Sequence, residues 1–249
     1  MSATNDDRDR AFSPGLTLYR WPESARVGRT VPKSKFYEHG NVTAAVKRHF
    51  VDDVESITWA YKLAPETIGL AATEAVSEVQ VFTITLKPGR DTLDNRVLAA
   101  INGAIPTAII FEVEKPAVVP VPSGVEPVET PAMVSMAAAP QVLGRRVRLE
   151  DYWTTPVQPQ DAPRVPLPPA ADLERLYTAL LAPTAPIVPQ AGETLAETHE
   201  RATRIAALDR EIGALARKLR AEKQLNRQMD LRRQLRAVEK ERQFLGKFE

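Results

Sequence analysis

Glu78 and Gln80 come closest, in residue type and spacing, to a reaction centre in this sequence, and Lys87 follows them at the far end of the same stretch. Nucleases of the restriction-endonuclease type hold Mg²⁺ beside a phosphate with an acidic residue on one strand and Glu-x-Lys, or more rarely Glu-x-Gln, on the next. Here the preceding segment, 67–72, has no aspartate, and the upstream Pro-Asp of that pattern is missing. The alternative is that these side chains satisfy local backbone at a strand edge. Mg²⁺ is expected only under the nuclease hypothesis, and no other cofactor is expected.

Other catalytic signatures are missing from the sequence. The three histidines, His39, His49 and His199, are scattered, and no H-E-x-x-H, G-x-x-x-x-G-K or G-x-S-x-G motif occurs. Because the chain has no cysteine, disulfides, thiolate metal sites and a cysteine nucleophile are excluded together. We expect His49 to be packed or hydrogen-bonded on a helix. Four acidic residues follow Gln80 and would belong to the same site under the nuclease hypothesis: Asp91, Asp94, Glu112 and Glu114.

A second set of residues could bind a partner. Between positions 217 and 236 there are eight cations against two anions, Glu222 and Asp230, although the whole chain has a formal net charge of +1. Guanidinium groups bind phosphate in a fork geometry and release counterions, so this segment could contact nucleic acid. The alternative is the solvated face of a coiled coil, with arginines lying along its seam. The eight cations are Arg217, Lys218, Arg220, Lys223, Arg227, Arg232, Arg233 and Arg236.

The segment 194–249 reads as helix with the apolar spacing of a coiled coil, so it needs an apolar partner surface. Two sets of seam residues differ in phase by about a third of a turn on a straight helix, with the break at 222–227. Either the helix continues and contacts two partners in succession, or it bends and its halves pack together. Since a tight hairpin would favour Gly or Pro at the break, we expect a continuous helix. The seam residues are Ile205, Leu208, Ile212, Leu215 and Leu219, then Leu231, Leu235 and Val238.

An α/β core, or alternatively an α+β core, must position the candidate residues: a small mixed sheet with two or three helices. Segments 56–63 and 67–72 read as a β-hairpin, and 79–86 reads as a central strand because it is apolar on both faces. A helical pattern from Leu93 to Ile105 then leads to a strand at 108–114, which predicts a crossover between parallel strands. Two more amphipathic helices are expected, one behind Asn41 as N-cap and one at 172–181.

Prolines divide the rest of the chain. Of the 21 prolines, 16 lie between Pro106 and Pro189, so regular structure there must be short. Short strands are expected at 132–139 and 146–153. The domain organisation we predict is an irregular N-terminal arm at 1–33, a core at 34–182 with a proline-rich insertion at 116–131, a proline-rich joint at 183–193 and a helical coiled-coil tail at 194–249.

The balanced charge does not indicate a nucleic-acid or membrane partner for the chain as a whole. The polar residues 1–10 lack the pattern of a secretory signal, and no stretch approaches the roughly 20 apolar residues that cross a bilayer. We therefore expect a soluble, cytoplasmic protein that does not associate with membranes.

Several segments carry a resemblance to a known family. They include Lys33-Ser-Lys-Phe-Tyr-Glu, Trp59-Ala-Tyr-Lys-Leu, Ile101-Asn-Gly-Ala-Ile-Pro and Glu222-Lys-Gln-Leu-Asn-Arg, together with the strand that begins at Glu78. In these the chain resembles domain-of-unknown-function family 4391, whose bacterial members tend to be encoded beside helicases and DNA methyltransferases in restriction or phage-defence clusters. The resemblance implies an accessory subunit of a DNA-processing system.

Three functional hypotheses remain open. The first is an accessory, non-catalytic subunit that docks on a helicase or DNA methyltransferase and uses its basic tail to dimerise, to hold that partner or to contact DNA. The second is a divergent Mg²⁺-dependent nuclease centred on Glu78 and Gln80. The third is a self-associating scaffold that binds no nucleic acid.

Overall fold

The computed structural model describes residues 18–39, 42–117, 131–140, 152–188, 190 and 193–246. The chain divides into two compact units, Met1–Thr184 and Ala185–Glu249, and each is described by itself. Most of the proline-rich insertion predicted at 116–131, most of the strand predicted at 146–153, and Asn41 lie outside the described residues. The N-cap of the helix expected behind Asn41 is Thr43, whose side chain accepts a hydrogen bond from the backbone N–H of Val46.

The first unit is built on a mixed sheet with the order β2-β3-β4-β5-β6-β7, and β8 also pairs with β6. A separate two-stranded parallel pair joins β1 to β9. The mixed α/β class predicted from the sequence is confirmed. The strands are β1 Leu18–Tyr19, β2 Arg26–Thr30, β3 Val54–Leu63, β4 Val79–Leu86, β5 Ala108–Lys115, β6 Met133–Ala138, β7 Trp153–Thr154, β8 Gln158–Pro159 and β9 Arg164–Val165.

The crossover predicted between parallel strands is present. β4 pairs with β5 in parallel, from Val79 opposite Ala108 to Thr85 opposite Glu114, and the helix α4, Asn95–Ala104, connects them. The side chain of Asp94 accepts a hydrogen bond from the backbone N–H of Arg96 and so caps the helix. The other neighbours of β4 and β5, which are β3 and β6, run antiparallel to them.

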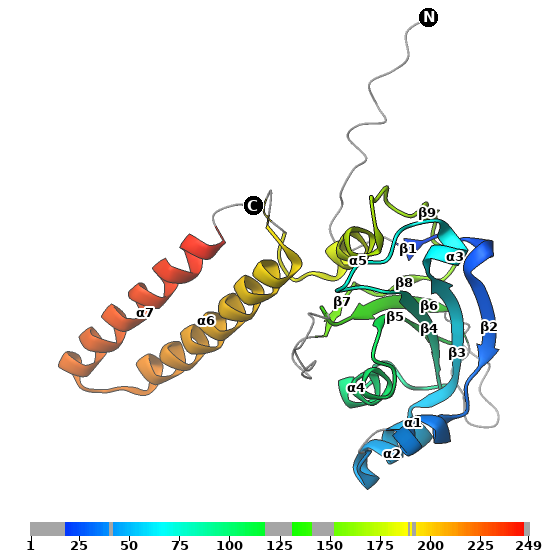
Figure 1. Cartoon of the computed structure of the whole chain (residues 1–249). Coiled ribbons are helices and arrows are strands. Elements are labelled where there is room, and N and C mark those ends of the chain that lie inside the picture. Colours follow the sequence, from blue (N-terminus) through cyan, green and yellow to red (C-terminus); the bar gives the residue numbers. More distant parts are fainter. Residues whose placement is uncertain are drawn as a thin grey trace, which may run out of the picture. The chain divides into compact units, whose positions relative to one another are not determined.

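Helices lie on both sides of the sheet (Figure 1). On one side are α1 Lys33–His39, α2 Ala44–Asp52 and α4, and on the other is α5 Leu173–Leu181. The side of α1, α2 and α4 holds an apolar core, where Phe36 and Phe50 stack with ring centroids 6.1 Å apart. Its other buried members include Ile57, Phe82, Ile84, Leu98, Ile101, Ile109 and Phe111.

Two sequence expectations about this unit were wrong. Segment 67–72 does not pair with 56–63: Pro65–Ile68 forms the one-turn helix α3, and the partner of β3 is β4. Pro65 occupies the first turn, where a helix tolerates its missing N–H, so the chain turns there instead of forming a hairpin. The region 1–33 is also not irregular throughout, because β2 pairs with β3 across a β-bulge.

The second unit is a helical hairpin of α6, Leu195–Ala221, and α7, Leu225–Leu245 (Figure 1). The expectation of one continuous helix was wrong, although the break falls where the seam changes phase. Glu222 is extended, and its carboxylate accepts hydrogen bonds from the backbone N–H groups of Lys223 and Gln224 at 2.8 and 2.9 Å. The turn therefore needs neither Gly nor Pro, because the Glu222 side chain satisfies the backbone N–H groups of the two residues that precede α7.

Candidate functional site

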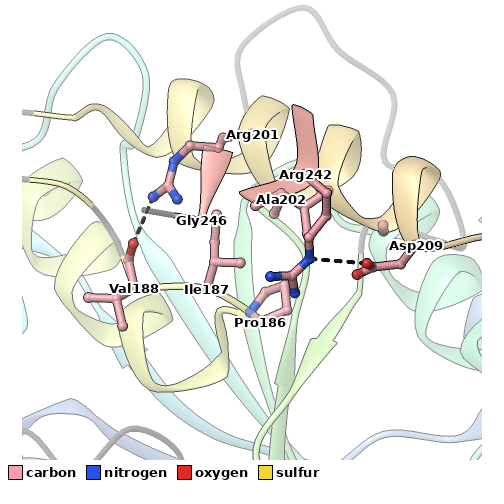
Figure 2. Close-up of a pocket in the computed structure, with 10 residues that line it drawn as sticks. Pro186, Ile187, Val188, Arg201, Ala202, Asp209, Arg242 and Gly246 are labelled. Carbon is pink, nitrogen blue, oxygen red and sulfur yellow. Dashed lines mark hydrogen bonds and ion pairs between the residues drawn. The ribbon is translucent and has the colours of Figure 1, made fainter. Parts of the chain in front are cut away.

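The open end of the helical hairpin is held together by ion pairs. Arg201 binds both carboxylate oxygens of Glu193 at 2.8 Å and donates to the carbonyl of Val188 at 2.7 Å. Figure 2 shows Arg201 reaching this carbonyl beside a cavity of about 160 Å³, where Arg242 also pairs with Asp209. The hydrogen bonds from Arg201 lower the pKa of Glu193 to about 2. These contacts tie Val188 and Glu193 to α6.

The two sets of seam residues meet inside the hairpin. Leu208 and Leu215 of α6 are buried, whereas Leu231, Leu235 and Val238 of α7 are half-buried. The two sets are out of phase only if they lie on one straight helix. Since the chain reverses between them, each set belongs to a separate helix and can face the other one. The hairpin thus supplies the first partner for its own seam and leaves the α7 side partly open.

The turn end of the hairpin, residues 217–236, is called the basic tip below. All eight cations predicted as phosphate ligands lie in it, and all eight are exposed. Chain reversal brings the cations at the end of α6 close to Lys223 and Arg227, whereas Arg232, Arg233 and Arg236 follow about two to three turns into α7. Among the described residues, carboxylate partners are found for two of them: Arg227 pairs with Glu222 at 4.0 Å and Arg233 with Asp230 at 2.6 Å.

Two apolar side chains stand out on the basic tip. Leu225 is 67% exposed and Met229, one turn later on α7, is 57% exposed. The tip also has an open hollow of about 460 Å³, which Lys218, Arg227 and Asp230 help to line. With eight cations and two anions, the tip has a net charge of +6. Such a surface can bind a polyanion through guanidinium and ammonium groups.

The residues proposed for the nuclease are not brought together. The Glu78 carboxylate pairs with Lys62 at 3.0 Å, and the Gln80 amide oxygen accepts a 2.6 Å hydrogen bond from Trp59 Nε1. Lys87 follows the other end of β4, about 30 Å away at roughly 3.3 Å per residue. Among the described residues, no group of three or more His, Asp or Glu side chains is placed to hold a metal ion.

His49 joins a hydrogen-bonded network of charged groups instead of standing free. Its Nδ1 lies 2.8 Å from Asp53 Oδ2, and its Nε2 lies 2.8 Å from Arg96. Since arginine only donates, Nε2 accepts and Nδ1–H donates to Asp53. Arg96 also forks onto Asp94 and lowers the pKa of that carboxyl to about 2. The network ties α2 to the start of α4, as expected for a structural histidine.

A polar hollow that the sequence did not indicate lies on the sheet, on the face opposite α1, α2 and α4. Register aligns Thr58 of β3, Thr83 of β4 and Glu112 of β5 in one row, and Ser56, Thr85 and Glu114 in the next. The hollow has a volume of about 410 Å³ and is lined by these strands, by β2 and by residues 20, 21 and 164. It is called the sheet hollow below.

Glu112 forms the buried end of the sheet hollow and is only 4% exposed. Its Oε1 accepts hydrogen bonds from Trp21 Nε1 at 2.8 Å and from Arg164 at 2.7 Å, and its Oε2 accepts a longer one from Arg164. The available sequence signal was Glu-x-Glu on an otherwise apolar strand. Its partners are 91 and 52 residues away along the chain, so local patterns could not find them.

Fold and sites define an α/β domain followed by a basic helical hairpin. None of the helices in the described residues is long and apolar enough to span a membrane. The chain belongs to the family described as a domain of unknown function, DUF4391, which it matches over residues 20–241. No curated protein and no solved structure matches the chain.

Proposed function

We propose that this protein is a non-catalytic accessory subunit that contacts nucleic acid through the basic tip. The observation that carries the proposal is the presence of eight exposed cations on the turn half of the hairpin, with a net charge of +6 in a chain whose formal net charge is +1. The open end of the same hairpin carries helix-to-helix ion pairs such as Arg242 with Asp209. Charge is thus balanced where the helices must be held together and unbalanced at the turn.

Phosphate contact fits the basic tip better than a solvated coiled-coil face does. A solvated face usually pairs its cations with acidic side chains three or four positions away. Here Arg217, Lys218 and Arg220 on α6 have no carboxylate partner within the described part of the chain. Exposed cations on the two helices beside the turn can reach successive phosphates, and each contact releases counterions from the nucleic acid.

Triple charge reversal in the basic tip tests the proposal. Arg227→Glu, Arg232→Glu and Arg233→Glu, made together, should abolish binding to a DNA duplex at 150 mM salt. Removal of three phosphate contacts should lower the slope of log K against log salt by about 3. Filter binding over a salt series measures both effects.

A matched variant controls for net charge. Arg48, Arg210 and Lys240 are exposed cations outside the basic tip, and their reversal to Glu changes the net charge by the same amount. This control should bind DNA nearly as the native chain does. An equal loss of DNA affinity in both variants, or no loss of affinity in the tip variant, would contradict the proposal.

As part of this accessory role, we propose that the chain binds a protein partner. That partner is a helicase or a DNA methyltransferase of a restriction-modification or phage-defence system. The half-open α7 face supports a docking role, since no residue of α7 is fully buried and Phe244 is exposed. Pull-down of neighbouring gene products with the native chain and with a Leu235→Glu variant tests this. A partner that the variant retains equally would not use this face.

Self-association is a second candidate, favoured by the same half-open face. A second hairpin could cover Leu231, Leu235 and Val238 and so complete a four-helix bundle. Size-exclusion chromatography with light scattering should then give a dimer for the native chain and a monomer for Leu235→Glu. A native monomer over the micromolar range would remove this candidate.

A further inference from the structure

The sheet hollow has a floor rich in hydrogen-bond acceptors. Glu112 at its buried end already accepts from Trp21 and Arg164, so it is fixed in place. Glu114 is partly buried and accepts from Gln160 at 2.8 Å and weakly from Thr85. Burial raises the pKa of Glu114, which means that water compensates its charge poorly. A ligand that donates hydrogen bonds would be stabilised at this floor.

The rim of the sheet hollow is basic. Arg20 and Arg26 line it and are exposed, and Arg164 lies between them and the floor. Arg26 forms an exposed ion pair with Glu23 at 3.0 Å, which contributes little to stability and leaves the guanidinium able to turn to another anion. The hydroxyl-bearing side chain of Tyr61 lines the same side. An anionic group would be stabilised at this rim.

We propose that the sheet hollow binds a nucleotide, with donors of the base or sugar at Glu114 and Thr83 and the phosphate at Arg20 and Arg26. The volume of about 410 Å³ falls in the range of small-molecule sites. A phosphate alone would not use the acceptor floor, and a nucleoside alone would not use the cationic rim. The nucleotide is either free or the terminus of a strand, and the two sources share this chemistry. The site lies in the first unit and does not depend on the basic tip.

Calorimetric titration of the full chain with 5′-nucleoside monophosphates tests the proposal. At least one monophosphate should bind, and Arg26→Gln should weaken it about tenfold, the usual effect of losing one charge-assisted hydrogen bond. Arg29→Gln is the matched control, because Arg29 lies on the same strand, is exposed and does not line the hollow. Glu114→Gln should weaken binding, whereas Glu55→Gln, exposed on β3, should not.

Two further titrations compare ligands. Inorganic phosphate and an unphosphorylated nucleoside should each bind at least tenfold more weakly than the nucleotide. A 5′-phosphorylated oligonucleotide that binds tighter than the monophosphate, and loses that gain in Arg26→Gln, identifies a strand terminus as the source, and the reverse order identifies a free nucleotide. No binding by any monophosphate, equal binding of phosphate alone, or unchanged binding in both Arg26→Gln and Glu114→Gln would overturn the proposal.

Discussion

At the scale of single residues, two glutamates on one strand have opposite energetic roles. Glu112 is buried and holds Arg164 and Trp21 together, so Glu112→Gln leaves Arg164 with a partly buried, uncompensated charge. We expect a loss of about 2–3 kcal/mol in unfolding free energy, somewhat below the range for breaking a fully buried pair. Urea titration at pH 7 measures it, and Glu55→Gln, exposed on β3, should lie within about 0.5 kcal/mol of the native chain.

Glu114 should behave in the opposite way. Burial places its pKa higher in the folded protein than in the unfolded chain. Ionisation therefore destabilises the fold as pH rises from the ordinary glutamate value through the raised pKa, and this stability returns as pH falls. Glu114→Gln removes that pH dependence, so the variant should be at least as stable as the native chain at pH 7. Thermal melts from pH 4 to 8 measure this. A much lower melting temperature for the variant than for the native chain at pH 7 would disprove the interpretation.

At the scale of elements, the hairpin owes its form to a few buried contacts in α6. Leu208 is 1% exposed, and Leu208→Ala should cost about 2–4 kcal/mol in hairpin stability through lost burial and an unfilled cavity. Leu225→Ala, at an exposed position of the same hairpin, should cost less than about 0.5 kcal/mol. Amide hydrogen exchange across 195–245 measures both. Similar protection loss in the two variants would mean that the seam does not hold the helices together.

The elements that could be predicted are those whose determining residues lie close together in the sequence. The strand 79–86, the helix capped by Asp94 and their parallel connection follow from patterns within about 35 residues. The hairpin was missed because its turn is held by hydrogen bonds to the carboxylate of Glu222, for which Gly and Pro are no guide. Among candidate sites, the basic tip was visible as composition, whereas the sheet hollow needed strand register and the distant Arg164.

At the scale of the whole molecule, charge is divided unevenly between the basic tip and the rest of the chain. The tip carries +6, from eight cations and two anions, so the remaining residues carry −5 in a chain of formal net charge +1. A polyanion at long range is therefore attracted more strongly to the tip than to the rest of the chain taken together. Such a distribution orients an encounter and accelerates it at low salt.

Division of the chain at the boundary of its two units should separate the two proposed binding activities. The apolar core of the first unit lies within Met1–Thr184, so this fragment should fold alone and melt cooperatively. It should keep nucleotide binding within about threefold, because the lining of the sheet hollow is complete in it. It should lose duplex binding, because both the +6 tip and the orienting charge division are gone. Retained duplex affinity in the folded fragment would place the nucleic-acid contact on the α/β domain and leave the basic tip without that role.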